Sequence, residues 1–175
     1  MRYLLSLLFI LVAGTAFADS GRFSKGRMSL GVGAGGGSGS FVVSGNYGYF
    51  VVDRLRPDIG LSYQYQDFGN ANAQQIRGNL SLRYYLVDAD PISPFLITSG
   101  GIIQLIHSGA GLDDSFTYYS VAGGLGGNMR LSRTLAMEVV VGGIQYLGVA
   151  QELLDREAVD EGVNFWWNLG LQISF

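Results

Sequence analysis

The feature that most constrains this chain is the alternation of apolar and polar residues at its C-terminal end. Residues 164–175 read NFWWNLGLQISF, with every odd-numbered position apolar and the even-numbered positions mostly polar or small. Successive side chains of a β-strand point to opposite faces, so this segment predicts a strand with one apolar and one polar face. The end of the chain is therefore expected to belong to a sheet that separates an apolar environment from a polar one.

The same kind of segment recurs along the chain and gives eight predicted strands. In residues 74–86, for example, the odd positions from 77 to 83 are polar, whereas the even positions from 76 to 86 are apolar or glycine. The eight segments are 27–34, 40–51, 58–65, 74–86, 95–106, 116–131, 135–149 and 164–175. Turns at 52–57, 87–94 and 132–134 alternate with loops at 35–39, 66–73, 107–115 and 150–163. This order predicts an antiparallel up-and-down sheet.

The first 18 residues have the features of an export signal. Arg2 provides a positive start, residues 4–12 are apolar except for Ser6, and residues 16–18 read AFA, a small-residue cleavage site. We expect the mature chain to begin at Asp19. The alternative is an uncleaved membrane helix, for which this apolar stretch is short.

After residue 18 no apolar run reaches the roughly 20 residues that a membrane helix needs. An export signal followed by alternating segments is instead typical of a transmembrane β-barrel, which has no edge and leaves no backbone group unpaired in lipid. The sequence predicts an all-β fold, an eight-stranded antiparallel up-and-down transmembrane β-barrel in the bacterial outer membrane, with both termini periplasmic. The predicted organisation is a cleaved signal peptide at 1–18, a short periplasmic N-terminal segment at 19–26 and the barrel at 27–175.

The aromatic residues favour the barrel over its alternative, a secreted β-sandwich, because transmembrane barrels carry aromatic bands at both membrane interfaces. The predicted outward-facing aromatics at the loop end are Phe41, Tyr65, Tyr119, Phe165 and Trp167. Those predicted at the turn end are Tyr49, Tyr84, Phe95 and Phe175.

These features resemble the small eight-stranded outer-membrane barrels of Gram-negative bacteria, the group that contains OmpX and the membrane domain of OmpA. The resemblance covers residues 27–175, and its most specific element is the strand 164–175 that ends on Phe175. In that group the barrel-assembly machinery recognises such a terminus, so the resemblance implies the same partner during biogenesis. Members include adhesion and host-interaction proteins, membrane anchors and a few lipid-modifying enzymes, so the fold does not select a function.

Composition and charge exclude several classes of site. The chain has no cysteine, which rules out disulfides and thiolate chemistry, and its net charge of -3 gives no basic field for nucleic acid. Residues 31–36 read GVGAGG and match G-x-G-x-x-G, but a strand rather than a helix follows, so we interpret them as part of a glycine-rich loop. We expect no cofactor, no metal, no nucleic-acid partner and a monomer.

His107 is the only histidine, and it is the candidate catalytic residue if the protein is an enzyme. Barrel-embedded lipid A deacylases and palmitoyltransferases use a histidine with a serine and an acidic residue, and Ser108, Asp113, Asp114 and Ser115 lie nearby in the sequence. Ser108 is a poor match because the residue next to His107 in a strand points to the opposite face. We therefore predict no catalytic residue and retain a lipid A or phospholipid modifying enzyme using His107 as the alternative.

The last loop, 150–163, is the most acidic one. Five acidic residues against the single Arg156 give it a net charge of -4, and residues 151–159 have the pattern of two amphipathic helical turns. It is a solvated connection in the simplest interpretation and otherwise a surface for an extracellular cationic partner; it lacks the spacing of a calcium-binding EF-hand loop. The candidate partner-binding residues are Glu152, Asp155, Glu157, Asp160 and Glu161.

The predicted barrel interior also contains charges. Eight strands leave room for little more than side chains, and a buried charge needs a partner. A turn at 132–134 places Glu138 opposite Asn128 and diagonal to Arg130, while Arg83 faces inward near the same end. We predict a polar network that plugs the periplasmic half of the barrel. Its members are Arg83, Asn128, Arg130, Glu138 and Gln172.

The sequence thus predicts a non-enzymatic integral outer-membrane barrel with a structural or surface-interaction, adhesion-like role through its extracellular loops. Its expected surroundings are outer-membrane lipids and lipopolysaccharide. Besides the enzyme, a small-solute channel is a second alternative, because the many inward glycines could leave gaps in the interior.

Overall fold

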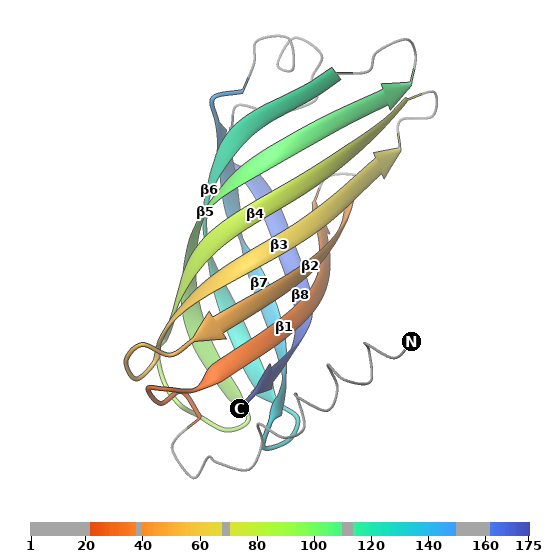
Figure 1. Ribbon diagram of the computed structural model, residues 1–175. Coiled ribbons are helices and arrows are strands. Elements are labelled where there is room, and N and C mark those ends of the chain that lie inside the picture. The colour runs from red at the N-terminus through yellow and green to blue at the C-terminus, as the bar shows by residue number, and fades with distance from the viewer. Residues whose placement is uncertain (1–21, 38–39, 68–70, 110–113, 150–161) are drawn as a thin grey trace.

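The computed structural model describes residues 22–37, 40–67, 71–109, 114–149 and 162–175. They form a closed barrel in which each strand pairs antiparallel with its neighbours in sequence and β1 pairs with β8 (Figure 1). The predicted eight-stranded all-β barrel is therefore confirmed. The strands are β1 (Met28–Gly37), β2 (Ser40–Tyr49), β3 (Leu55–Asp67), β4 (Ala71–Tyr85), β5 (Ile92–Gly109), β6 (Asp114–Arg130), β7 (Leu135–Leu147) and β8 (Asn164–Ser174). Over these ranges no helix is long and apolar enough to span a bilayer.

The two ends of the barrel differ in their connections. Short segments join β2 to β3, β4 to β5 and β6 to β7 at the end where the C-terminus also lies, at the bottom of Figure 1. We call this the turn end and the opposite one the loop end. Closure at the turn end is complete, because Met28 and Phe175 exchange two backbone hydrogen bonds of 2.9 and 3.0 Å.

Some strands extend beyond the predicted segments, whereas β2, β7 and β8 end earlier than predicted. β5 spans residues 92–109 rather than the predicted 95–106, because its backbone pairs with Met129 of β6 at Ile92 and with Ala71 of β4 at Gly109. The predicted turn 52–57 is also too long. The Leu55 amide donates to the Val52 carbonyl at 3.2 Å, so the connection tightens and β3 begins at Leu55. Arg56 consequently lies in the sheet, opposite Arg83.

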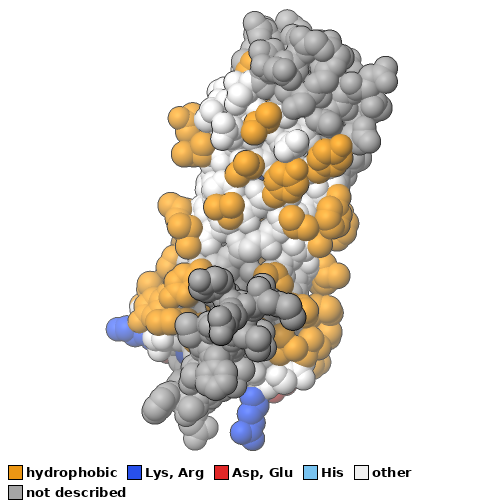
Figure 2. Space-filling model, turned by 45° about the vertical axis from the view of Figure 1, so that its right-hand side comes forward, with side chains coloured by type: hydrophobic (Ala, Val, Ile, Leu, Met, Phe, Trp, Pro, Cys, Tyr) orange, Lys and Arg blue, Asp and Glu red, His pale blue; other side chains and the backbone are white. Residues whose placement is uncertain are grey.

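The outer wall carries the apolar side chains, as the alternation predicts. The loop-end aromatics Phe41, Tyr119 and Phe165 are 60%, 56% and 64% exposed, and Tyr49 and Tyr84 are exposed near the turn end. In the face shown in Figure 2, apolar side chains are spread over the wall in separate groups, and Lys and Arg side chains project at the lower end. Such a surface matches a barrel surrounded by lipid.

The prediction that Phe95 belongs to the outward-facing aromatic band at the turn end is wrong. Phe95 is fully buried, because the odd positions of β5 face the lumen and the register places Phe95 opposite Tyr85, which is also fully buried. The two rings lie 5.2 Å apart between centroids. Phe95 therefore contributes to the packing of the interior rather than to the interface with lipid.

Candidate functional site: a charge network in the lumen

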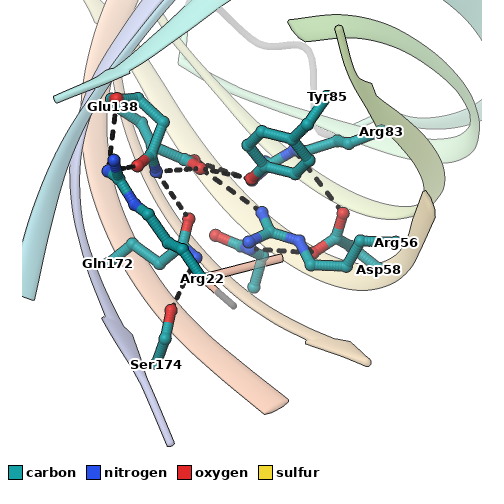
Figure 3. Close-up of polar contacts among 10 residues, drawn as sticks. Arg22, Arg56, Asp58, Arg83, Tyr85, Glu138, Gln172 and Ser174 are labelled. Carbon is teal, nitrogen blue, oxygen red and sulfur yellow. Dashed lines mark hydrogen bonds and ion pairs between the residues drawn. The ribbon is translucent and has the colours of Figure 1, made fainter. Parts of the chain in front are cut away.

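Four charged side chains from three strands meet inside the turn-end half of the barrel (Figure 3). Arg56 and Asp58 come from β3, Arg83 from β4 and Glu138 from β7. We call these residues the charge quartet. All four are buried, with residue exposures of 8% or less. Their even positions on β3 and β7 and the odd position on β4 are the inward-facing ones, so the alternation itself brings these charges together.

Positive and negative groups alternate around the quartet. Arg56 Nε lies 2.9 Å from Asp58 Oδ1, and Arg83 Nε lies 3.5 Å from Asp58 Oδ2. Glu138 completes the circuit, since its Oε2 accepts from Arg83 Nη1 at 2.7 Å and its Oε1 accepts from Arg56 Nη2 at 3.4 Å. Each carboxylate therefore contacts both arginines. The formal charges of the quartet sum to zero, which is what a buried cluster requires.

Neutral side chains extend the quartet into a larger network. Tyr85 Oη donates to Glu138 Oε1 at 3.1 Å, and Asn128 Nδ2 donates to the same oxygen at 3.0 Å. Asn128 Nδ2 also lies 3.3 Å from Gln172 Oε1, and Gln172 Nε2 donates to Ser174 Oγ at 3.0 Å. Asn46 Nδ2 is 3.4 Å from Asp58 Oδ1. These contacts connect β2, β3, β4, β6, β7 and β8 across the lumen.

Aromatic rings surround the arginines. The guanidinium carbon of Arg56 lies 5.5 Å from the Phe50 centroid and 5.6 Å from that of Tyr85, and the guanidinium carbon of Arg83 lies 5.7 Å from the Phe95 centroid. Within about 6 Å, such cation–π contacts are attractive, most of all away from water. The rings thus exclude water and bind the cations at the same time.

The described N-terminal residues close this end. Phe23 is 4% exposed and stacks on Tyr85 at 3.9 Å between ring centroids, while the Arg22 side chain bonds to the Asn128 side chain and, at 3.2 Å, to its backbone carbonyl. Burial lowers the pKa of Arg22, and Arg130 lowers it further, whereas the nearby aspartates raise it. Because the ordinary pKa of a guanidinium lies far above neutrality, Arg22 stays charged at neutral pH.

Four of the five residues that the sequence assigns to the network lie together: Arg83, Asn128, Glu138 and Gln172. The assignment of Arg130 is wrong. It has the inward parity but lies two residues beyond Asn128, at the rim, where its Nη1 contacts Asp90 Oδ2 at 2.8 Å. The Arg130 side chain is 39% exposed. It therefore pairs with a solvent-exposed aspartate at the rim and does not join the network in the lumen.

Sequence reasoning misses Arg56, Asp58, Tyr85 and the pair Arg22 and Phe23. Parity could have found the first three, since Asp58 and Arg56 share the even parity of inward Gly60 and Tyr85 continues the odd inward series of β4. No alternation marks Phe23, which precedes the first strand. Its place in the interior follows from three-dimensional packing.

The loop-end half of the lumen is built differently. Ile103, Leu105 and Tyr118 are buried there, with Phe116 and Tyr146 packed against them. Arg77 faces this region, opposite Ile103 in the register, and forms no ion pair with any described residue. Among the described residues, its buried Nε lacks a hydrogen-bond partner, as does the hydroxyl of Tyr118.

Two further candidate sites lie outside the described side chains. The acidic residues Glu152, Asp155, Glu157, Asp160 and Glu161 are outside the described residues altogether. His107 belongs to β5, where its backbone pairs with Ala73 and Asp114, but its side chain is outside the described part.

The quartet does not offer a metal site. Both carboxylates are occupied by arginines, which leaves little negative potential for a cation. In the part of the chain that the structure describes, no three His, Cys, Asp or Glu side chains cluster as metal ligands. The arrangement is suited to holding strands together and filling the lumen.

Comparison with known proteins supports the fold. No protein-family model and no curated protein matches the sequence. Among solved structures, the N-terminal β-barrel domain of Pseudomonas aeruginosa OprF aligns with a TM-score of 0.65 at 12% identity, covering 86% of this chain and 98% of that one. Neisserial surface protein A gives 0.64 at 12% identity, covering 85% and 95%. Ail, the attachment invasion locus protein of Yersinia pestis, gives 0.54 at 12% identity, covering 86% and 99%. The chain thus has the fold of the small eight-stranded outer-membrane barrels.

Proposed function

We propose that this protein is a non-enzymatic outer-membrane barrel that acts as a structural or surface-interaction protein through its loops. The observation that carries the proposal is the filled turn end. A neutralised charge quartet, three aromatic rings and Phe23 occupy the lumen there, and this filling supports a barrel without an open path for solutes. A role in binding then falls to the loop end.

The proposal includes processing and orientation. Residues 1–18 are removed on export, both termini face the periplasm, and the longer loops lie outside the cell, as an export signal and even strand number indicate. Outer-membrane lipids and lipopolysaccharide surround the wall, and the barrel-assembly machinery inserts the chain. The protein acts as a monomer.

The acidic last loop is the proposed contact surface. Yersinia pestis Ail has been crystallised in complex with the heparin analogue sucrose octasulfate, a polyanion. The loop 150–163 of this chain has the opposite preference, because its net charge of -4 repels polysulfates and attracts cationic partners. We therefore propose a partner with a basic surface.

The test replaces Glu152, Asp155, Glu157, Asp160 and Glu161 by their amides on intact cells. Binding of a basic probe protein such as a polylysine conjugate should fall severalfold at low salt and little at high salt, because the attraction is screened. A protease-cleavable tag in the same loop, cut from outside, verifies display and orientation. Binding unchanged by the amides, with the tag cut, would leave the loop as a solvated connection and contradict the proposal.

A further inference from the structure

The N-terminal segment 22–27 is fastened to the connection between β2 and β3. The Gly26 amide donates to the Phe50 carbonyl at 2.8 Å, and the Phe50 amide donates to the Arg27 carbonyl at 2.9 Å. The Arg54 amide donates to the Phe23 carbonyl at 2.8 Å, and the Lys25 amide donates to Asp53 Oδ1 at 2.8 Å. Gly26 has φ +92°, a left-handed conformation that favours glycine.

Two side chains of this segment, Arg22 and Phe23, contact residues of the barrel interior. Phe23 lies 3.9 Å from Tyr85 and 5.8 Å from Phe50 between ring centroids, so it covers the tyrosine whose hydroxyl bonds to Glu138. The Arg22 guanidinium reaches the carbonyl and side chain of Asn128 on β6, 106 positions away in the chain, and lies 5.0 Å from the Phe23 ring. Together they bridge β4 and β6 across the opening.

The barrel ladder does not include this segment. β1 begins at Met28, and every strand has both of its neighbours without residues 22–27. The segment instead contributes two buried side chains that cover the charge quartet, where water would otherwise meet Tyr85 and Asn128. The strands and the segment thus have different roles. Strand pairing forms the barrel wall, and residues 22–27 cover one end of the lumen.

We propose that residues 22–27 are a built-in stopper that docks, through Arg22 and Phe23, on a site formed by Phe50, Tyr85 and Asn128 and seals the turn end of the lumen. Residues 22–26 belong to the predicted short periplasmic N-terminal segment 19–26, and the proposal gives them this role. The stopper keeps water and small reagents away from the quartet, and the wall of the barrel forms without it.

The absence of cysteine in the chain allows a direct test with a single reporter thiol. Ser29 is fully buried two residues after the segment, beside Gly48 and Ser174 in the register, and its hydroxyl has no hydrogen-bond partner among the described residues. Ser29→Cys is therefore a mild substitution. Labelling of this thiol by a charged methanethiosulfonate in detergent micelles reports opening of the turn end.

In the Ser29→Cys background, Phe23→Ala should raise the labelling rate at least about tenfold, because reaction of a buried thiol follows the population of open molecules. The matched control is Phe41→Ala, which removes an aromatic ring from the outer wall and should leave the rate unchanged. Ser132→Cys, in the exposed turn between β6 and β7, gives the rate of an unprotected thiol. Heat-modifiable migration in gels verifies that each variant is folded.

Arg22→Gln is the second variant and keeps Phe23 in place. It should fold and raise the rate by a smaller factor than Phe23→Ala, because it removes the charged contacts of Arg22 to Asn128, Asp90 and the Phe23 ring but leaves the ring itself over Tyr85. If Phe23→Ala does not fold, the segment belongs to the barrel core and the stopper proposal fails. If both variants fold and the reporter thiol at position 29 stays protected, the segment does not seal the lumen and the proposal fails as well.

Discussion

The two halves of the lumen differ in how their inward-facing charged groups are compensated. At the turn end, two arginines and two carboxylates contact one another, and tyrosine and asparagine supply further hydrogen bonds. At the loop end, Ile103, Leu105 and Tyr118 pack near a cation, Arg77, that has no ionic partner among the described residues. Both halves contain buried polar atoms without a hydrogen-bond partner among the described residues, Arg56 Nη1 in the first and Arg77 Nε in the second. The halves differ in ion pairing, because the charges of the first compensate one another, whereas Arg77 has no counter-ion among the described residues.

This difference indicates where the stability of the barrel depends on charge. A buried charge whose partner is removed is expensive, because its remaining counterpart is left without solvation. Each member of the quartet contacts two others, so removing one leaves two arginines or two carboxylates poorly compensated. Arg77 has no such dependence within the described residues, and its loss strands no other charge there.

The largest effect is expected for Glu138→Gln. The substitution keeps the shape of the side chain but leaves Arg56 and Arg83 with Asp58 as their only anion in the quartet, and should destabilise the folded barrel by about 3–5 kcal/mol. Urea unfolding in lipid or detergent measures the change. Arg130→Gln is the control, since this exposed rim pair should contribute less than about 1 kcal/mol. If Glu138→Gln and Arg130→Gln lost the same free energy of unfolding, ion pairs in the lumen would not stabilise the barrel more than those at the rim.

A medium effect is expected for Gly48→Ala, which tests how tightly the quartet is packed. A Cβ at residue 48 would overlap Asp58 Oδ1 and lie 2.9 Å from Arg56 Cδ, so the ion pair would have to shift. Overpacking of this kind costs about 1–3 kcal/mol. Gly78→Ala is the matched control, because no atom lies within 4 Å of its added Cβ, and it should change stability by less than about 0.5 kcal/mol.

The smallest effect is expected for Arg77→Met, which probes the loop-end half. Removing a cation without an ionic partner among the described residues, while keeping its apolar stem, should be neutral or stabilise the barrel by up to about 1 kcal/mol. The same urea experiment decides the outcome. A loss of more than about 2 kcal/mol would show that Arg77 is held by a partner as firmly as Arg83 is, and the contrast between the halves would disappear.

Most of the fold could be predicted from sequence because lipid outside and polar groups inside impose a period of two on every strand. The same period places Arg83, Asn128, Glu138 and Gln172 inside. It does not fix height along the axis, which is why Arg130, with the correct parity, lies at the rim. It also fails where a strand begins inside an apparent turn, as at Arg56, whose neighbours Arg54 and Pro57 suggest a connection.

The stopper could not be predicted in this way. Phe23 belongs to no strand, and the segment around it, RFSKGR, has no periodicity that distinguishes a plug from a tail. What positions it is a set of contacts to Phe50, Arg54, Tyr85 and Asn128, residues that are far apart in the chain. Only closure of the barrel brings them together.

Some inward glycines and asparagines of neighbouring strands occupy a shared space. A Cβ at Gly60 would lie 2.7 Å from Asn79 Oδ1 on the paired strand, and one at Gly31 would overlap Asn46 Oδ1. Each such pair holds one large side chain between two positions, and either strand could in principle supply it. In evolution, these positions are therefore free to exchange roles but not to enlarge independently, so divergence inside the lumen should proceed by compensated pairs while the lipid-facing wall changes one residue at a time.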